Sequence, residues 1–91
     1  MSSYEKDKQK IQQRLRRIEG QLRGIQKMID EDKYCIDILT QLSSVIAATQ
    51  KVGLVVLQDH INGCLKDALI NKDGQVKIDE MIKVVDRFIK A

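Results

Sequence analysis

The sequence contains no proline and no tryptophan, and its 91 residues include only one phenylalanine and two tyrosines. Hydrophobic residues make up 43% of the chain and charged residues 32%. This composition is typical of helical bundles and argues against a β-sandwich, whose strands are rich in aromatic side chains. We therefore predict an all-α fold.

Long apolar runs are also lacking, since none approaches the roughly 18 residues that a membrane span needs. Residues 1–10 carry too many charges for a signal peptide. These absences predict a cytoplasmic protein with no membrane partner. Thiols stay reduced in the cytoplasm, so the two cysteines favour metal binding or redox sensing over a disulfide. A single histidine, no carboxylate pair clustered with it and no phosphate-binding loop argue against an enzyme.

The chain is long enough for one domain, residues 1–91, but a domain of this size buries only about two thirds of the surface that its unfolded chain exposes. Association with further copies is therefore a natural source of stability. Three helices are predicted in this domain. The first covers about residues 4–30, where apolar side chains recur at alternating steps of four and three. They are Ile11, Leu15, Ile18, Leu22, Ile25 and Ile29.

The second predicted helix covers about residues 33–70, with Asp32 as its N-cap. It has two apolar faces, so one can pack on the first helix and the other on a second subunit. The faces are Ile38, Leu42, Val45, Val52 and Val56, and Leu39, Ile46 and Leu57. Asn62 and Gly63 are able to end this helix, but apolar residues resume at Leu65, so we predict continuation. A break at Asn71–Gly74 and a short third helix, about residues 76–89, follow.

The only histidine and the only two cysteines have a spacing that suits a metal site. His60 and Cys64 are four residues apart, so a helix places them on one face, about 6 Å apart along its axis. Cys35 shares that face but lies about 43 Å from Cys64 on an unbroken helix. Two antiparallel helices that cross near residues 48 and 49 would bring Cys35 of each copy to His60 and Cys64 of the other. Two equivalent sites then form by symmetry.

Two thiolates and one imidazole form a soft, three-coordinate ligand set that favours Cu(I). Zn²⁺ normally takes a fourth ligand, which water or Glu80 could supply, so zinc is disfavoured without being excluded. Ni²⁺ and Co²⁺ usually need more nitrogen ligands than one histidine provides. The competing interpretation treats the cysteines as small buried hydrophobes and His60 as a surface residue.

The predicted first helix has a basic face, opposed between residues 6 and 27 only by Asp7 and Glu19. Gly20 and Gly24 lie near the middle of that side, and glycines inside a helix indicate a close approach of phosphate or of another helix. Such a face can neutralise DNA phosphates and read guanine edges. A solvated face that keeps the protein soluble accounts for the same charges, and the sequence has no helix-turn-helix pattern or aromatic platform. The cations include Lys6, Lys10, Arg14, Arg16, Arg17, Arg23 and Lys27.

Several segments together closely resemble the CsoR/RcnR family of bacterial repressors, and the resemblance covers nearly the whole chain. The segments are residues 14–25, residues 28–32, residues 34–37 with 39–41, and Asp59-His60 with Cys64. The resemblance implies an all-helical subunit, an antiparallel dimer that forms a four-helix bundle, and a dimer of dimers that binds operator DNA. It also implies a repressor that leaves its operator when the sensory site is filled.

Within the family, Cys35, His60 and Cys64 match the Cys-His-Cys pattern of the copper(I)-sensing branch. The nickel and cobalt branch has histidine in place of Cys64, the persulfide branch lacks the histidine, and the formaldehyde branch lacks the second thiol. A nickel-sensing offshoot adds an N-terminal histidine, which this sequence does not have. The resemblance further implies that Tyr34 and Glu80 hydrogen-bond near the histidine and couple metal binding to DNA release. It also implies DNA contacts from Arg14, Arg16 and Arg17, and Lys10, Arg23 and Lys27 are further candidates.

The leading hypothesis is a copper(I)-responsive transcriptional repressor of copper export and homeostasis genes. Two alternatives remain at this point. A repressor of the same family could respond to persulfide or disulfide formation at its two thiols, although that chemistry has no need for His60. A copper-buffering protein could act without DNA, although it has no need for the arginine-rich face.

Overall fold

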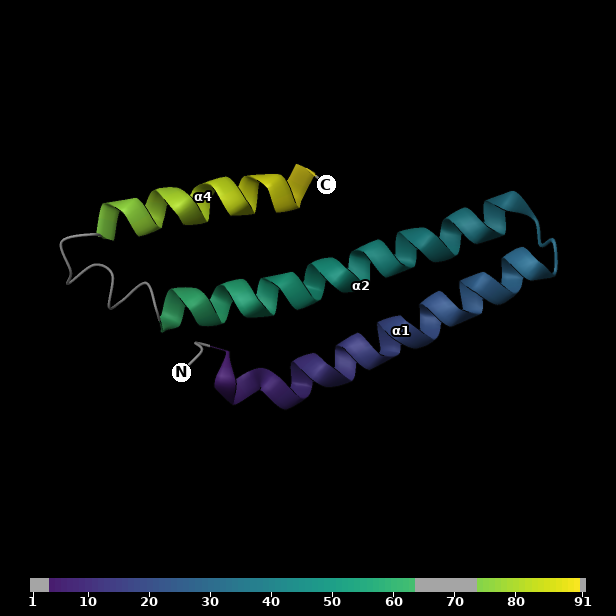
Figure 1. The fold of residues 1–91 in the computed structure, drawn as a ribbon, viewed down its shortest axis with the longest axis horizontal. Helices are drawn as coiled ribbons and strands as arrows, with labels where there is room; N and C mark the ends of the chain where they lie inside the picture. Colours follow the sequence, from purple (N-terminus) through teal and green to yellow (C-terminus); the bar gives the residue numbers. More distant parts are fainter. Residues whose placement is uncertain (1–3, 64–73, 91) are drawn as a thin grey trace.

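The computed structural model describes residues 4–63 and 74–90, which form helices joined by short connections. A 3-10 turn, η1 (Glu5–Asp7), leads into α1 (Lys8–Asp30), and a tight turn joins α1 to α2 (Cys35–Asn62). The remaining described helix is α4 (Gly74–Lys90). α1 and α2 run antiparallel, and α4 lies along the other side of α2 (Figure 1). The predicted all-α fold is confirmed for the described residues.

α1 packs on α2 through apolar side chains that repeat every seven residues. Ile11, Ile18 and Ile25 are the buried residues of α1. Val52 is the buried apolar residue of α2, and it packs in one cluster with Ile11 and Ile18. Val45, Ala48 and Val55 surround this cluster and are partly buried. Of the two predicted apolar faces of the second helix, the packing therefore places the one with Val45 and Val52 against the first helix.

The turn after α1 is a Schellman motif, which ends a helix with a left-handed residue. The backbone N–H of Lys33 donates to the carbonyl of Met28 at 3.0 Å, and that of Asp32 donates to Ile29 at 3.1 Å. Asp32 has the left-handed φ of 54° that the motif requires. The predicted N-cap role of Asp32 is therefore wrong, because Asp32 terminates α1 and α2 begins after Tyr34, without a side-chain cap.

α2 ends earlier than predicted. Its last residue is Asn62, and the N–H of the following Gly63 donates to the carbonyl of Asp59 at 2.9 Å. Glycine disfavours the helix interior, and here it stands at the C-cap, so the predicted continuation through Gly63 is wrong. Residues 64–73, which include Cys64 and most of the predicted break, lie outside the described residues. The predicted third helix is confirmed as α4.

The chain forms one layer of helices instead of a two-layer core (Figure 1). It measures 56 × 27 × 13 Å, and the shortest dimension is close to the diameter of one helix with its side chains. The radius of gyration is 17.1 Å, whereas a compact domain of this length has about 12 Å. Because domains normally bury their core between two layers, a single layer leaves apolar faces uncovered.

The uncovered apolar surface lies mainly on α2. Its large exposed hydrophobic residues include Ile36, Leu39, Ile46, Leu54 and Ile61. By length and composition, with a mean hydropathy of 1.2 over its most apolar window, α2 would qualify as a membrane span. This corrects the expectation that no segment reaches that level, because the one charged residue in the window, Lys51, lowers the average too little. Helices that bury apolar surface against a protein partner pass the same test.

Candidate metal centre

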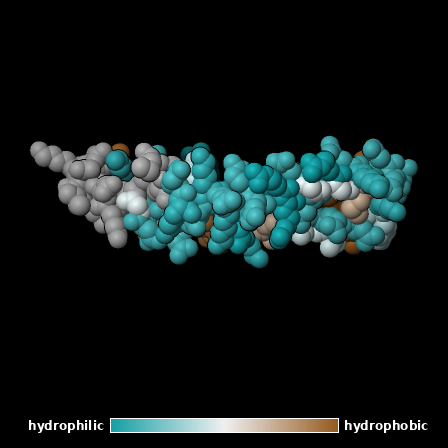
Figure 2. All heavy atoms as spheres, turned by 90° about the horizontal axis from the view of Figure 1, so that it is seen from below, coloured by the Kyte–Doolittle hydropathy of each residue, from teal (hydrophilic) through white to brown (hydrophobic). Residues whose placement is uncertain are grey.

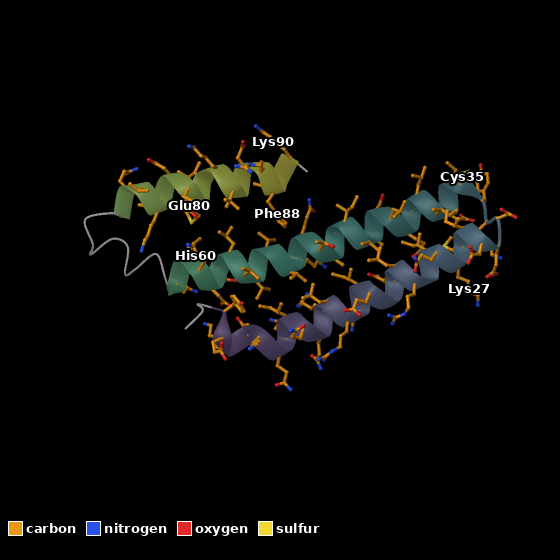
Figure 3. All side chains as sticks on the ribbon, viewed as in Figure 1. Lys27, Cys35, His60, Glu80, Phe88 and Lys90 are labelled. Atoms are coloured by element: carbon orange, nitrogen blue, oxygen red, sulfur yellow. The ribbon has the colours of Figure 1, made fainter. Side chains whose placement is uncertain are left out.

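α2 carries both described members of the predicted metal-binding set, at its opposite ends (Figure 3). Cys35 is the first residue of the helix and has an exposed, free thiol. His60 lies in the last turn and is half-buried. Their separation of 25 positions corresponds to about 37 Å along the helix. One copy of the chain therefore keeps this thiol and this imidazole apart.

The third member of the set, Cys64, lies outside the described residues. Among residues 4–63 and 74–90, no three side chains of the His, Cys, Asp and Glu types are grouped closely enough to hold a metal ion. His60 and Cys35 would fit a soft cation such as Cu(I) by their donor chemistry. Their separation means that a site containing both must draw on a second chain.

Tyr34 and Glu80, which are expected to couple metal binding to DNA release, lie near opposite ends of α2. Tyr34 directly precedes the helix, and its carbonyl accepts hydrogen bonds from the N–H groups of Asp37 at 3.0 Å and Ile38 at 3.2 Å. Its own side chain is 69% exposed. Glu80 lies on α4, opposite the part of α2 that carries His60 (Figure 3). Within one chain, Glu80 therefore lies at the His60 end of α2, and Tyr34 lies at the Cys35 end.

Asp59 is a buried carboxylate that the sequence reasoning did not assign to any role. Its side chain is 4% exposed, and its Oδ2 atom has no hydrogen-bond partner among the described residues. Burial raises the pKa of Asp59, and a hydrogen bond and repulsion from the Asp7 carboxyl raise this pKa further. The positive charges of Lys6 and Lys10 act in the opposite direction. Asp59, at the end of α2 that bears His60, thus interacts with residues at the start of α1.

A sequence signal for Asp59 exists in its spacing. It follows Val52 by seven residues, and Val52 follows Val45 by seven, so Asp59 continues the stripe of α2 that faces α1. A carboxylate at an apolar position of a helix is a candidate for an unusual pKa.

The outer side of α1 carries most of the cations that were predicted to contact DNA. Arg16, Arg17, Arg23, Lys10 and Lys27 are exposed, whereas Arg14 is half-buried. Figure 2 shows the molecule from the α1 side, and hydrophilic residues cover most of its length. Lys27 points away from α2 (Figure 3). A hollow on this surface is lined by Lys10, Gln13, Arg14 and Arg17.

The two glycines on this helix leave open space beside the backbone. A Cβ atom added at Gly24 would meet no atom within 4 Å, and one added at Gly20 would meet only the Arg23 guanidinium at 3.9 Å. Packing within the chain therefore does not require glycine at either position. The predicted close approach of another molecule at these glycines stays a prediction.

Comparison with known proteins relates the chain to metal-responsive regulators. Residues 7–87 match the sequence model of a family described as metal-sensitive transcriptional repressor. The chain is 48% identical over 86 residues to the copper-sensing transcriptional repressor CsoR of Bacillus subtilis (strain 168), covering 94% of this chain and 85% of that protein. It is 50% identical over 92 residues to the copper-sensing transcriptional repressor RicR of Mycobacterium tuberculosis (strain ATCC 25618 / H37Rv), covering 97% and 94%.

Solved structures are similar as well. The copper-sensing repressor CsoR with Cu(I) from Geobacillus thermodenitrificans NG80-2 superposes with a TM-score of 0.83 at 40% identity, over 92% of this chain and 88% of that one. The nickel-responsive transcriptional regulator InrS superposes with a TM-score of 0.72 at 35% identity, over 88% and 90%. Both similarities extend over most of the chain and include its helical arrangement.

Proposed function

The chain belongs to the family of metal-sensitive transcriptional repressors, and we propose that it binds DNA when metal-free and releases it when Cu(I) binds. The genes it represses are then those of copper export and homeostasis. Relatives named as copper-sensing repressors support copper as the signal. A transcriptional repressor must reach the DNA, which in bacteria lies in the cytoplasm, and this supports a cytoplasmic location.

The observation that carries this proposal is the position of Cys35 and His60 at the two ends of α2. In an antiparallel pair of α2 helices, the first turn of each copy lies beside the last turn of the other. Cys35 of one copy then joins His60 and Cys64 of its partner, and each dimer holds two such sites. Two thiolates and one imidazole suit Cu(I), which accepts three ligands and prefers sulfur.

The same pairing gives Tyr34 and Glu80 a shared neighbour. Tyr34 is next to Cys35, and Glu80 is opposite the end of α2 that carries His60. Antiparallel pairing therefore brings Tyr34 of one copy to the His60 and Glu80 end of the other. We assign both side chains to hydrogen bonds around His60, because an imidazole ligand needs a partner at its second nitrogen to fix its orientation.

The shape of the chain supports association with further copies. Leu15, Leu22 and Ile29 on α1 are exposed, as are Leu39 and Ile46 on α2, although all five belong to the predicted apolar faces. A second layer of helices would cover these residues and create the core that a single layer lacks. The proposed assembly is a dimer with a four-helix core, and a dimer of dimers follows from the family resemblance.

DNA binding is assigned to the outer side of α1. Its exposed arginines and lysines can neutralise phosphates, and two copies of the face in a symmetric assembly can contact two segments of a duplex. Arg14, Arg16 and Arg17 form the centre of this contact, and Lys10, Arg23 and Lys27 extend it. Metal binding across the dimer changes how the subunits sit relative to one another, so the basic faces no longer match the DNA.

An anaerobic Cu(I) titration against a competing chelator, with and without operator-like duplex DNA, tests the proposal. We expect about one Cu(I) per chain, with weaker binding on DNA, because linkage requires that metal and DNA disfavour each other equally. Tight Cu(I) binding that is indifferent to DNA would indicate copper buffering. Weak Cu(I) binding, with DNA release by a persulfide donor, would indicate thiol sensing. The same assay with Ni²⁺ in place of Cu(I) tests whether nickel is the signal, because InrS is named as a nickel-responsive regulator.

A further inference from the structure

One side of α4 has a narrow line of less exposed residues. Gly74 is buried, and Ile78, Met81 and Val85 are half-buried, at the four-and-three spacing of one helix face. Phe88 continues this face and is 38% exposed. The other large apolar residues of α4 are more exposed, including Val76, Ile82, Val84 and Ile89. The inner line of α4 therefore ends at Phe88.

The ring of Phe88 sits directly on the backbone of α2 at Gly53. A Cβ atom added at Gly53 would lie 2.6 Å from Cε1 and 3.1 Å from Cε2 of the ring, and closer still to Cζ. No side chain can occupy these positions while the ring stays in place. Figure 3 shows the Phe88 side chain extending from α4 toward α2. Glycine is unfavourable inside a helix, and at Gly53 its effect is to admit this ring.

The other half of α4 carries Glu80, which lies opposite the His60 end of α2 (Figure 3). Phe88 follows Glu80 by eight residues, or about 12 Å along the helix. A helix that loses a packing contact at one end can swing away from the helix on which it packs.

We propose that the Phe88 ring on Gly53 is the anchor that docks α4 along α2, and that this anchor keeps Glu80 beside His60. Phe88 and Gly53 are then positioning residues for metal-dependent release of DNA, although neither touches the metal. The anchor is a property of the fold, and only its effect on DNA release rests on the proposed function.

The docking step is tested by amide hydrogen exchange in α4 of the full-length, metal-free protein. Phe88→Ala and Gly53→Ala should each speed exchange in α4 by about fivefold or more, the factor expected when a half-buried phenylalanine loses its contact. Ile89→Ala is the matched control, because Ile89 is the next residue of α4 and is 68% exposed. It should leave exchange unchanged. Unchanged exchange in Phe88→Ala would overturn the anchor.

A double-mutant cycle tests whether the two residues act through one contact. Once Phe88 is alanine, a Cβ atom at Gly53 has room, so the double variant should exchange no faster than Phe88→Ala alone. Additive effects would contradict a direct contact. Phe88 is also the only phenylalanine, so ring labelling with ¹³C yields one side-chain signal that should shift in Gly53→Ala. The cycle does not depend on copper.

The positioning role is tested by the ratio of DNA affinities without and with Cu(I). We expect Phe88→Ala and Gly53→Ala to reduce this ratio by about tenfold, within the range of typical allosteric couplings. Cu(I) affinity without DNA should stay within about threefold of wild type, since all three proposed ligands remain. A wild-type ratio in Phe88→Ala would overturn the positioning role. A wild-type protein that ignores Cu(I) would refute the proposed function, while the exchange data would still decide the anchor.

Discussion

His60 is the residue at which capture of the metal and transmission of the signal can be separated. His60→Ala leaves both thiolates, so the variant should keep part of its Cu(I) affinity, because thiolates are strong ligands for Cu(I). It should lose most of the coupling to DNA, since the proposed contacts of Tyr34 and Glu80 act through the imidazole. The measurement is DNA affinity with and without Cu(I), and Asn62→Ala, at an exposed position of the same turn, is the control. Release of His60→Ala from DNA as readily as wild type would refute this role.

Asp59 makes a prediction about stability and pH. Its pKa is raised in the folded chain, so folding favours the protonated carboxyl and ionisation destabilises the fold as pH rises above the ordinary value of 3.8. Asp59→Asn removes this ionisation, and its amide can donate to Asp7 at every pH. The variant should therefore melt higher than wild type at pH 7, and the gain should shrink as pH falls toward 3.8.

Thermal melts of the two proteins between pH 4 and pH 7 test this prediction. Glu19→Gln, which removes a negative charge from an exposed position of α1, controls for the change in net charge. An Asp59→Asn variant that is less stable than wild type at pH 7 would mean that the carboxylate has a cationic partner strong enough to offset its burial.

At the scale of the elements, the turn between α1 and α2 depends on one left-handed residue. Asp32 tolerates φ of 54°, but a left-handed residue other than glycine costs about 1 kcal/mol. Asp32→Gly should raise the free energy of unfolding by about 0.5–1 kcal/mol, and Asp32→Val should lower it by about 1–2 kcal/mol. Urea unfolding measures both changes. Glu31→Gly, at a neighbouring φ of −91°, should bring no gain, and a gain there would contradict the explanation.

The apolar periodicity of the sequence predicts where helices lie but not where they end. The apolar repeats of α1 and α4 predicted both helices, because a helix that buries one face must repeat its apolar residues at that period. The end of α2 was not predicted correctly, since apolar residues after Gly63 continued the pattern while Gly63 itself ended the helix. Termination depends on the backbone at one or two residues, to which a periodicity over many residues is insensitive.

On the scale of the whole molecule, the flat chain predicts that association depends on its exposed apolar face. Ile46 is 58% exposed in the single chain, and a charge at this position should disfavour burial against a second copy. Ile46→Glu should therefore reduce the mass measured by light scattering to that of one chain. Gln58→Glu adds the same charge on a different, exposed side of α2 and should keep the assembled mass. An assembled Ile46→Glu protein would exclude this face from the interface.

The proposed sharing of the metal site between two chains leads to a prediction that a site within one chain would not fulfil. Cys35→Ala and His60→Ala each break both proposed sites of a dimer when present in every subunit. A mixed dimer of the two variants regains one intact site, made from the unmodified Cys35 of one chain and the unmodified His60 and Cys64 of the other. Refolding the variants together should restore tight binding of one Cu(I) per mixed dimer, measured by chelator competition. No recovery in verified mixed dimers would refute sharing.

The sequence by itself determined the helical class and the three helices, because periodicity is a local property of the chain, and it predicted Cys35, His60 and Cys64 as one set of ligands. It also predicted that one chain cannot close the metal site, since helix length follows directly from residue number. Only the tertiary structure decided the left-handed turn at Asp32, the burial of Asp59 against the start of α1, and the seat of Phe88 on Gly53. The burial of Asp59 and the contact of Phe88 with Gly53 depend on how segments distant in sequence approach in space. The turn at Asp32 is local, but it depends on the φ of one residue, which an aspartate does not dictate.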